Sequence, residues 1–128
     1  MAKKKILVVE DDPHVLQTLK DRLESQGYEV ITAKDGEIGL TRAKVESPDL
    51  ILLDVMLPIK HGYTICWFLK SEKKYSHIPI IMLTARTQAA DIALGKDVGA
   101  DAYITKPYDM ETLLSKISEL LGSAIRPG

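Results

Sequence analysis

The sequence has a single cysteine, Cys66, and no long apolar run at its N-terminus. One cysteine excludes an internal disulfide and suits a reducing compartment, where a lone thiol within an apolar stretch is usually a small core residue. The apolar run after the basic N-terminus covers only residues 6–9 before acids begin. Such a run is too short for a signal peptide or a membrane span. These absences predict a cytoplasmic protein with no membrane partner.

The sequence also lacks an excess of charge of either sign. It holds 17 basic and 18 acidic residues, so its formal net charge is -1. No field of the whole molecule then favours nucleic acid, and any electrostatic function must be local. The 128 residues are the usual size of one domain and too few for two ordinary ones. We therefore expect one domain that does not itself bind nucleic acid, followed in residues 122–128 by a tail or the start of a linker.

Short apolar runs alternate with helical patterns along the whole sequence. The runs predict strands at residues 5–10, 28–33, 50–54, 78–84 and 102–105. The helical stripes that follow them are Val15, Leu16, Leu19 and Leu23; Ile38, Leu40, Ala43 and Val45; Ile65, Phe68 and Leu69; residues 92–98; and residues 110–121. Five such units predict an α/β protein with a single doubly wound parallel sheet, covered by helices on both faces.

Polar and charged side chains gather at the carboxyl ends of the predicted strands. In a doubly wound sheet, these ends form the edge at which ligands bind. The residues at this edge are Glu10, Asp11, Asp12, Asp54, Thr84 and Lys106. The sequence has no Gly-x-Gly-x-x-Gly turn and no Walker-type glycine loop, so we do not expect a nucleotide cradle.

The crowded carboxylates need a proton or a positive charge. Two unit charges about 4 Å apart repel by roughly 1 kcal/mol in water and by roughly 4 kcal/mol at an effective dielectric constant near 20. A raised pKa is one remedy, and a hard divalent cation is another, because clustered carboxylate oxygens are its natural ligands. Mg2+ fits well because it keeps several waters and often binds beside a phosphate. Thr84 and Lys106 would then hold the anionic group.

Helix capping and solvated turns are simpler explanations for some of these residues. Asp12 precedes Pro13, and this pair is typical of the start of a helix with aspartate as the N-cap. Lys106 precedes Pro107 and, taken alone, is typical of a solvated turn. Asp54 differs from both, because a segment with proline and glycine follows it and a helix cap explains it poorly.

Taken together, four segments resemble the receiver domain of two-component response regulators, the CheY-like family. They are VVEDD at residues 8–12, Asp54 with the following VMLPIKHG, LTAR at residues 83–86 and GADAYITKP at residues 99–107. Their order and spacing fit the family. The resemblance implies a flavodoxin-like (βα)5 domain with strand order 2-1-3-4-5, and we expect the receiver domain to occupy residues 1–121.

The resemblance also implies how the acids would act. Asp54 would be the phosphoacceptor and would take a phosphoryl group from a sensor histidine kinase or a phosphotransfer protein. Glu10 and Asp11 would hold Mg2+ together with Asp54 and the backbone carbonyl of Met56. Which of Glu10 and Asp11 contacts the ion directly stays open.

For the remaining residues the resemblance implies phosphate binding and switching. Lys106 would pair with the phosphoryl group, and Thr84 would donate its hydroxyl to it. Tyr103 would turn inward when Thr84 moves and would change the surface made by the fourth helix, the fifth strand and the fifth helix. The bond between Lys106 and Pro107 would be cis.

Three functions are compatible with this set of residues. The first is a phosphoacceptor switch that promotes its own phosphorylation and dephosphorylation and signals to an unidentified downstream protein. The second is a Mg2+-dependent phosphate-ester hydrolase, although the haloacid dehalogenase type requires an Asp-x-Asp pair that VEDDP does not supply. The third is a pseudo-receiver that only binds partners, which the intact set of site residues argues against. We predict the switch, not an enzyme.

Overall fold

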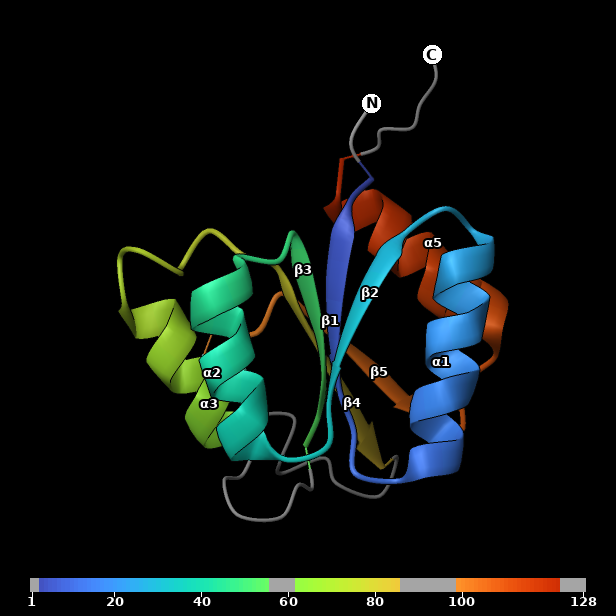
Figure 1. Cartoon of the computed structure of the whole chain (residues 1–128), viewed down its shortest axis with the longest axis horizontal. Helices are drawn as coiled ribbons and strands as arrows, with labels where there is room; N and C mark the ends of the chain where they lie inside the picture. Colours follow the sequence, from blue (N-terminus) through green and yellow to red (C-terminus); the bar gives the residue numbers. More distant parts are fainter. Residues whose placement is uncertain (1–2, 56–61, 86–98, 123–128) are drawn as a thin grey trace.

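The computed structural model describes residues 3–55, 62–85 and 99–122. Its centre is a sheet of five parallel strands in the order β2-β1-β3-β4-β5 (Figure 1). The strands are β1 (Lys5–Val9), β2 (Glu29–Ala33), β3 (Leu50–Asp54), β4 (Ile80–Ala85) and β5 (Ala102–Lys106). The predicted strand order and parallel direction are confirmed.

Helices cover both faces of the sheet. Those described are α1 (Pro13–Ser25), α2 (Gly36–Glu46), α3 (Gly62–Ser71) and α5 (Met110–Leu120). Helices α1 and α5 lie on one face, and α2 and α3 lie on the other (Figure 1). The predicted fourth helix falls outside the described residues. In the parts of the chain that the structure describes, no helix is long and apolar enough to cross a membrane.

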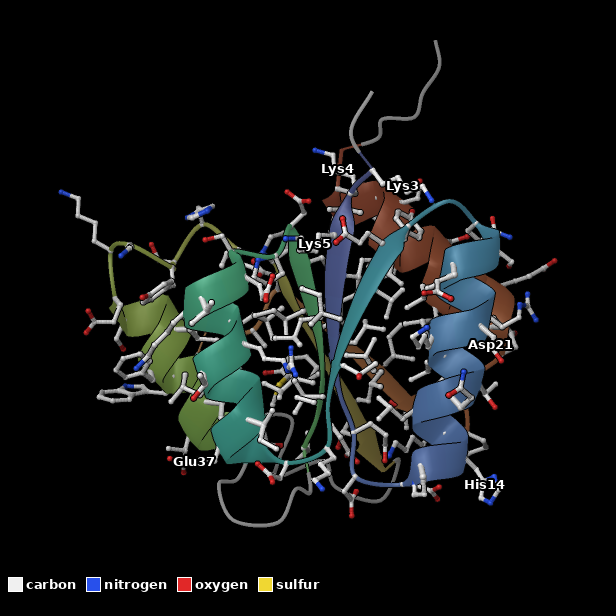
Figure 2. All side chains as sticks on the ribbon, in the orientation of Figure 1. Lys3, Lys4, Lys5, His14, Asp21 and Glu37 are labelled. Carbon is white, nitrogen blue, oxygen red and sulfur yellow. The ribbon has the colours of Figure 1, made fainter. Side chains whose placement is uncertain are left out.

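Strands β1 and β3 lie inside the sheet and are buried on both faces. Ile6 and Val8 belong to the core under α1 and α5, whereas Leu7 and Val9 belong to the core under α2 and α3, because successive side chains of a strand point to opposite faces. Figure 2 shows side chains filling the space on both sides of the sheet. Since every position of β3 is buried, including Asp54, its final carboxylate lies inside the fold rather than on its surface.

Aspartates begin three of the described helices. The Oδ1 atom of Asp12 accepts a hydrogen bond from the backbone nitrogen of His14 at 2.9 Å, and Asp35 and Asp109 cap α2 and α5 in the same way. These carboxylates satisfy backbone N–H groups that have no partner within the helix. His14 itself is exposed at the start of α1 (Figure 2). Asp12 therefore serves α1, as its position before a proline predicts.

The predicted second helix is present as α2, but its apolar residues do not share one face. Val45 is 73% exposed. Ala43 of the same helix is fully buried. Two residues turn an α-helix by about 200°, so Val45 and Ala43 cannot share a face.

Candidate functional site

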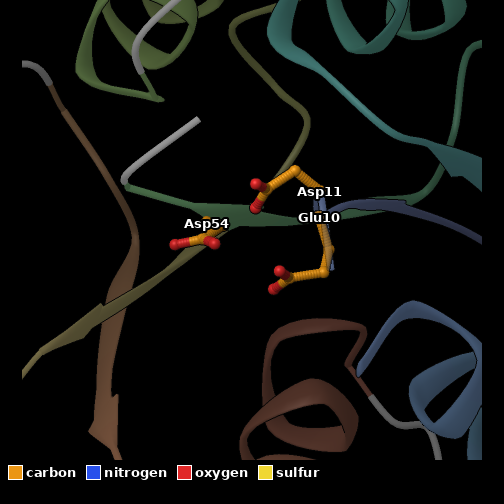
Figure 3. Close-up of side chains that lie close together, drawn as sticks. All are labelled: Glu10, Asp11 and Asp54. Atoms are coloured by element: carbon orange, nitrogen blue, oxygen red, sulfur yellow. The ribbon is translucent and has the colours of Figure 1, made fainter. Parts of the chain in front are cut away.

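Three carboxylates meet at the carboxyl edge of the sheet, where β1 and β3 end. Asp54 is the last residue of β3, and Glu10 and Asp11 follow β1 directly. Since Val9 is aligned with Leu53, the parallel register brings Glu10 level with Asp54. Figure 3 shows the three side chains grouped around one space. One carboxylate oxygen from each residue lies within 4.8 Å of those of the other two.

The three carboxylates differ in exposure. Glu10 is 2% exposed and Asp54 is 5% exposed, whereas Asp11 lies on the surface. Oε2 of Glu10 accepts a hydrogen bond from the backbone nitrogen of Asp12 at 3.1 Å. The buried Oε1 atom accepts no hydrogen bond from any residue in the described ranges. Leaving a buried carboxylate oxygen without a partner costs free energy, so Oε1 is a favourable ligand atom for a cation.

Lys106 brings a positive charge to these carboxylates. It ends β5, next to Ala85 of β4, and its peptide bond to Pro107 is cis, as the resemblance implies. Its Nζ atom lies 3.3 Å from Oδ1 of Asp54 and 4.0 Å from Oε1 of Glu10. Lys106 therefore belongs to the site and not to a solvated turn. With all groups ionised, three carboxylates and one ammonium still leave an excess of negative charge.

The surroundings of Glu10 favour its uncharged form. Its pKa is raised to about 7, mainly by burial and also by the charge of Asp54, whereas the hydrogen bond from Asp12 and the charge of Lys106 lower it. The pKa of Tyr108 is raised as well, first by burial and then by the charges of Glu10 and Asp54. Burial is the largest cause of both pKa shifts, and the neighbouring carboxylates add to it.

Thr84 and Tyr103 lie on the two strands beside the carboxylates. Leu83 is aligned with Asp54 across β3 and β4, so Thr84 lies one position farther toward the carboxyl edge, where it is 1% exposed. Tyr103 is half-buried and packs against the core under α2 and α3. Met56, whose carbonyl is a predicted metal ligand, lies outside the described residues. The structure thus brings Thr84 to the same edge as the carboxylates and places Tyr103 farther back along the sheet.

The fold and the acidic strand ends are those of a known family. The family model of the response regulator receiver domain matches residues 6–118. The chain belongs to this family. It is accordingly a receiver domain of two-component response regulators, which are signalling proteins.

Curated relatives of this receiver domain include longer regulators. A probable transcriptional regulator ycf27 from Cyanophora paradoxa is 46% identical over 125 residues, which cover 98% of this chain and 51% of the relative. The alkaline phosphatase synthesis transcriptional regulatory protein PhoP of Bacillus subtilis is 45% identical over 118 residues, which cover 92% of this chain and 48% of the relative. The chain spans about half the length of the curated relatives it matches.

Solved structures share the fold over nearly their whole length. The receiver domain of a signal transduction histidine kinase from Syntrophus aciditrophicus superposes with a TM-score of 0.89 at 34% identity, covering 98% of this chain and 95% of that chain. The chemotaxis protein CheY4 of Vibrio cholerae superposes with a TM-score of 0.86 at 34% identity, covering 93% and 99%. A receiver fold therefore accounts for all of this chain that the structure describes.

The acidic edge of the receiver domain suits a hard divalent cation. Glu10, Asp11 and Asp54 offer oxygen atoms only, which Mg2+ and Ca2+ prefer over softer ligands. The buried Oε1 of Glu10 lacks a hydrogen-bond partner among the described residues, and Lys106 compensates only part of the negative charge. The residues present thus fit a bound Mg2+ ion.

Two further residues, Tyr108 and Gly62, lie beside the site. Burial raises the pKa of Tyr108, and the charges of Glu10 and Asp54 raise it further. Its position two residues after Lys106 was the only signal of this in the sequence. Gly62 begins α3, and its N–H donates to the backbone oxygen of Val55 at 3.0 Å. A glycine at the end of VMLPIKHG suggested a loop but gave no sign of this contact.

Proposed function

We propose that this receiver domain takes a phosphoryl group onto Asp54 from a phosphohistidine of a sensor histidine kinase or phosphotransfer protein, in the presence of Mg2+. The observation that carries the proposal is the group of three carboxylates whose charge a lysine only partly balances. Nζ of Lys106 lies 3.3 Å from Oδ1 of Asp54, and a carboxylate oxygen is a known nucleophile in aspartyl-phosphate chemistry.

In the transfer step, a carboxylate oxygen of Asp54 attacks the phosphorus atom of the donor. An O–P bond forms while the P–N bond of the phosphohistidine breaks, and the electron pair of that bond stays on the imidazole nitrogen. A proton on the other ring nitrogen, or one taken up from solvent as the bond breaks, lets the histidine leave as neutral imidazole. Asp54 ends a strand that is paired on both sides, so its position is fixed before the donor arrives, which favours an in-line attack.

The acids around Asp54 would hold the cation. Glu10 and Asp11 supply carboxylate oxygens, and the backbone carbonyl of Met56 completes the protein ligands in this proposal. When bound, Mg2+ neutralises negative charge on the phosphoryl oxygens. Oε1 of Glu10 accepts no hydrogen bond from the described residues, which supports this arrangement, since a cation there would offset its burial.

The remaining site residues would convert phosphorylation into a change of surface. Lys106 would pair with the phosphoryl group, Thr84 would donate its hydroxyl to it, and Tyr103 would turn inward beside β5. Phosphorylation would then shift the population between two states only by its different interactions with each. In this proposal the domain is a switch that promotes its own phosphorylation and dephosphorylation.

The output of the switch would be contact with a downstream protein. Relatives of about twice this length are named transcriptional regulators, whereas this chain has a formal net charge of only -1. We therefore assign it no direct contact with nucleic acid. Residues 1–121 would form the receiver unit, and residues 122–128 would form a tail or the start of a linker.

Incubation with Mg2+ and acetyl phosphate, followed by intact mass spectrometry and mapping of the modified residue, tests the proposal. We expect wild type to gain a phosphoryl group on Asp54 and Asp54→Asn to gain none. Asp12→Asn is a matched control, because asparagine caps a helix about as well as aspartate. This variant should be modified as wild type is.

The proposal is wrong if wild type gains no phosphoryl group or if Asp54→Asn gains it as readily. Steady release of phosphate from general phosphate esters, without a stable modification of Asp54, would favour the hydrolase. The same incubation in EDTA tests the need for Mg2+, because phosphoryl transfer that requires the ion should stop when EDTA removes it.

A further inference from the structure

The start of α3 lies directly against the backbone of Asp54. Gly62 is the first residue of this helix and is buried. A Cβ atom added to Gly62 would lie 2.5 Å from the backbone oxygen of Asp54 and 3.0 Å from both the Cα and the backbone oxygen of Val55. Real Cβ atoms essentially never approach a heavy atom to 2.5 Å. The space at this position therefore admits no side chain at all.

The backbone on the strand side of this contact cannot move cheaply. The N–H of Val55 donates to the backbone oxygen of Leu83 at 3.0 Å, and Asp54 is aligned with Leu83 in the sheet. Asp54 is 5% exposed and Val55 is fully buried. A displacement of this peptide group would therefore carry the Asp54 carboxylate with it.

The helix on the other side is held along its length. Ile65, Cys66 and Leu69 are buried in the core under α2 and α3. Near the end of the helix, Nζ of Lys70 donates to the backbone oxygen of Ile78 at 2.7 Å and pairs with Asp101 at 2.7 Å. A methyl group at Gly62 would therefore press on the backbone oxygen of Asp54 with both elements held in place, and any shift that it forces in the strand moves the Asp54 carboxylate.

A second helical glycine shows what a milder contact looks like. A Cβ atom at Gly39 of α2 would lie 2.8 Å and 2.9 Å from the two methyl carbons of Val9. Those atoms belong to a side chain, so the contact affects packing between α2 and β1 and not a backbone segment that ends in a carboxylate.

From these contacts we infer that Gly62 is a positioning residue for Asp54. Because Gly62 has no side chain, α3 can begin directly against the backbone of Asp54. Its N–H also donates a hydrogen bond to the backbone oxygen of Val55 at 3.0 Å, which ties the start of α3 to the end of β3. This contact fixes the direction of the Asp54 carboxylate relative to Glu10 and Lys106. The inference deepens the proposed function and rests on it for its effect on phosphorylation.

The test compares Gly62→Ala with Leu23→Ala. Leu23 is fully buried in α1, on the opposite face of the sheet, so its truncation lowers stability without touching the site. Both variants and wild type are titrated with Mg2+ by calorimetry and are then phosphorylated with acetyl phosphate. Trimethylamine N-oxide is added to all samples, because this osmolyte favours the folded state.

We expect Gly62→Ala to bind Mg2+ roughly tenfold more weakly, as loss of a supporting contact around metal ligands does. Its phosphorylation should be slower by on the order of 100-fold, the effect of a misplacement of about 1 Å. Leu23→Ala should match wild type in both measurements at a lower midpoint of thermal unfolding. A glycine with a merely structural role would lower the midpoint of thermal unfolding when substituted but would not lower the Mg2+ affinity or the phosphorylation rate of the folded protein.

Two results would overturn the inference. One is a folded Gly62→Ala protein with the Mg2+ affinity and phosphorylation rate of wild type. The other is a Gly62→Ala chain that stays unfolded in the osmolyte while Leu23→Ala folds, because the cost would then fall on the whole fold. If wild type itself binds no Mg2+, the proposed function fails, and hydrogen exchange at the amides of Gly62 and Val55 still decides whether the methyl group displaces the strand end.

Discussion

Glu10 is a buried carboxyl group, and Nζ of Lys106 comes only to 4.0 Å from its Oε1 atom. Its pKa is raised from 4.5 to about 7, with burial as the main cause. A raised pKa means that the folded state binds the proton more tightly than the unfolded chain does. Without Mg2+, the contribution of Glu10 to the free energy of unfolding is therefore greatest below pH 4.5 and is lost as the pH rises through about 7.

This shift gives a prediction for Glu10→Gln in EDTA. As the pH rises from about 5 to about 8, wild type should lose up to about 3 kcal/mol of stability relative to the variant, which has no carboxyl group to ionise. Urea unfolding at several pH values measures the difference. Parallel stability curves for the two proteins would show that Glu10 is not the group responsible.

Cys66 illustrates the opposite case, a group that burial keeps inert. It is fully buried in α3, and burial, partly opposed by the charge of Lys70, raises the pKa of its thiol to about 12. The thiolate is the reactive form. We expect iodoacetamide to leave Cys66 unmodified in the folded protein near neutral pH and to modify it fully in urea. Equal rates in both conditions would contradict its place in the core.

At the scale of elements, a lysine joins the end of α3 to the starts of two strands. Nζ of Lys70 contacts the backbone oxygens of Ser76 and Ile78 as well as the carboxylate of Asp101, whose Oδ2 accepts a hydrogen bond from the backbone nitrogen of Ile80 at 2.8 Å. The Lys70 side chain is only 13% exposed. Removing the ammonium would leave the Asp101 carboxylate and the two backbone oxygens without this donor, and the oxygen of Ile78 belongs to a buried residue.

We therefore expect Lys70→Met to lower the free energy of unfolding by about 2 kcal/mol or more. Lys20→Met is the matched control, since Lys20 pairs with Glu24 on the exposed side of α1 at 2.9 Å. Exposed pairs of this kind contribute about 0.3 to 0.5 kcal/mol. Chemical denaturation of both variants gives the comparison, and equal losses would mean that the Lys70 contacts carry no special weight.

The strands could be predicted as short apolar runs, and the helices could be predicted from apolar residues at helical spacing. Leu19 and Leu23 of α1 follow helical spacing, and both are buried. The exposure of Val45 could not be predicted, because α2 has few apolar residues and they do not mark which of its faces is buried. The contact between Lys70 and Asp101 could not be predicted, because it depends on how two distant segments pack and not on any local pattern.

The site could be predicted in outline for a different reason. Parallel strands bring their carboxyl ends to one edge, so Asp54 and Lys106 had to lie near one another once the sheet was known. The unequal exposure of Glu10 and Asp11 could not be read from adjacent positions in the sequence. The contact of Gly62 with Asp54 was equally hidden, since it arises from the angle at which α3 meets the sheet.

For the whole molecule, an ion that binds only the folded state must raise its stability. At a Mg2+ concentration 100 times the dissociation constant, linkage predicts a gain of about 2.7 kcal/mol, or several degrees in the midpoint of thermal unfolding. Asp54→Asn removes one of the three carboxylates that lie within 4.8 Å of one another, so we expect its midpoint to rise much less with Mg2+.

Asp21→Asn is the control for this measurement. Asp21 is exposed on α1 (Figure 2) and only accepts a hydrogen bond from Gln17 at 2.9 Å, so its variant should respond to Mg2+ as wild type does. Thermal scans with increasing MgCl2, at constant ionic strength, separate specific binding from general screening. A rise of the same size in Asp54→Asn as in wild type would place the stabilising ion elsewhere on the molecule.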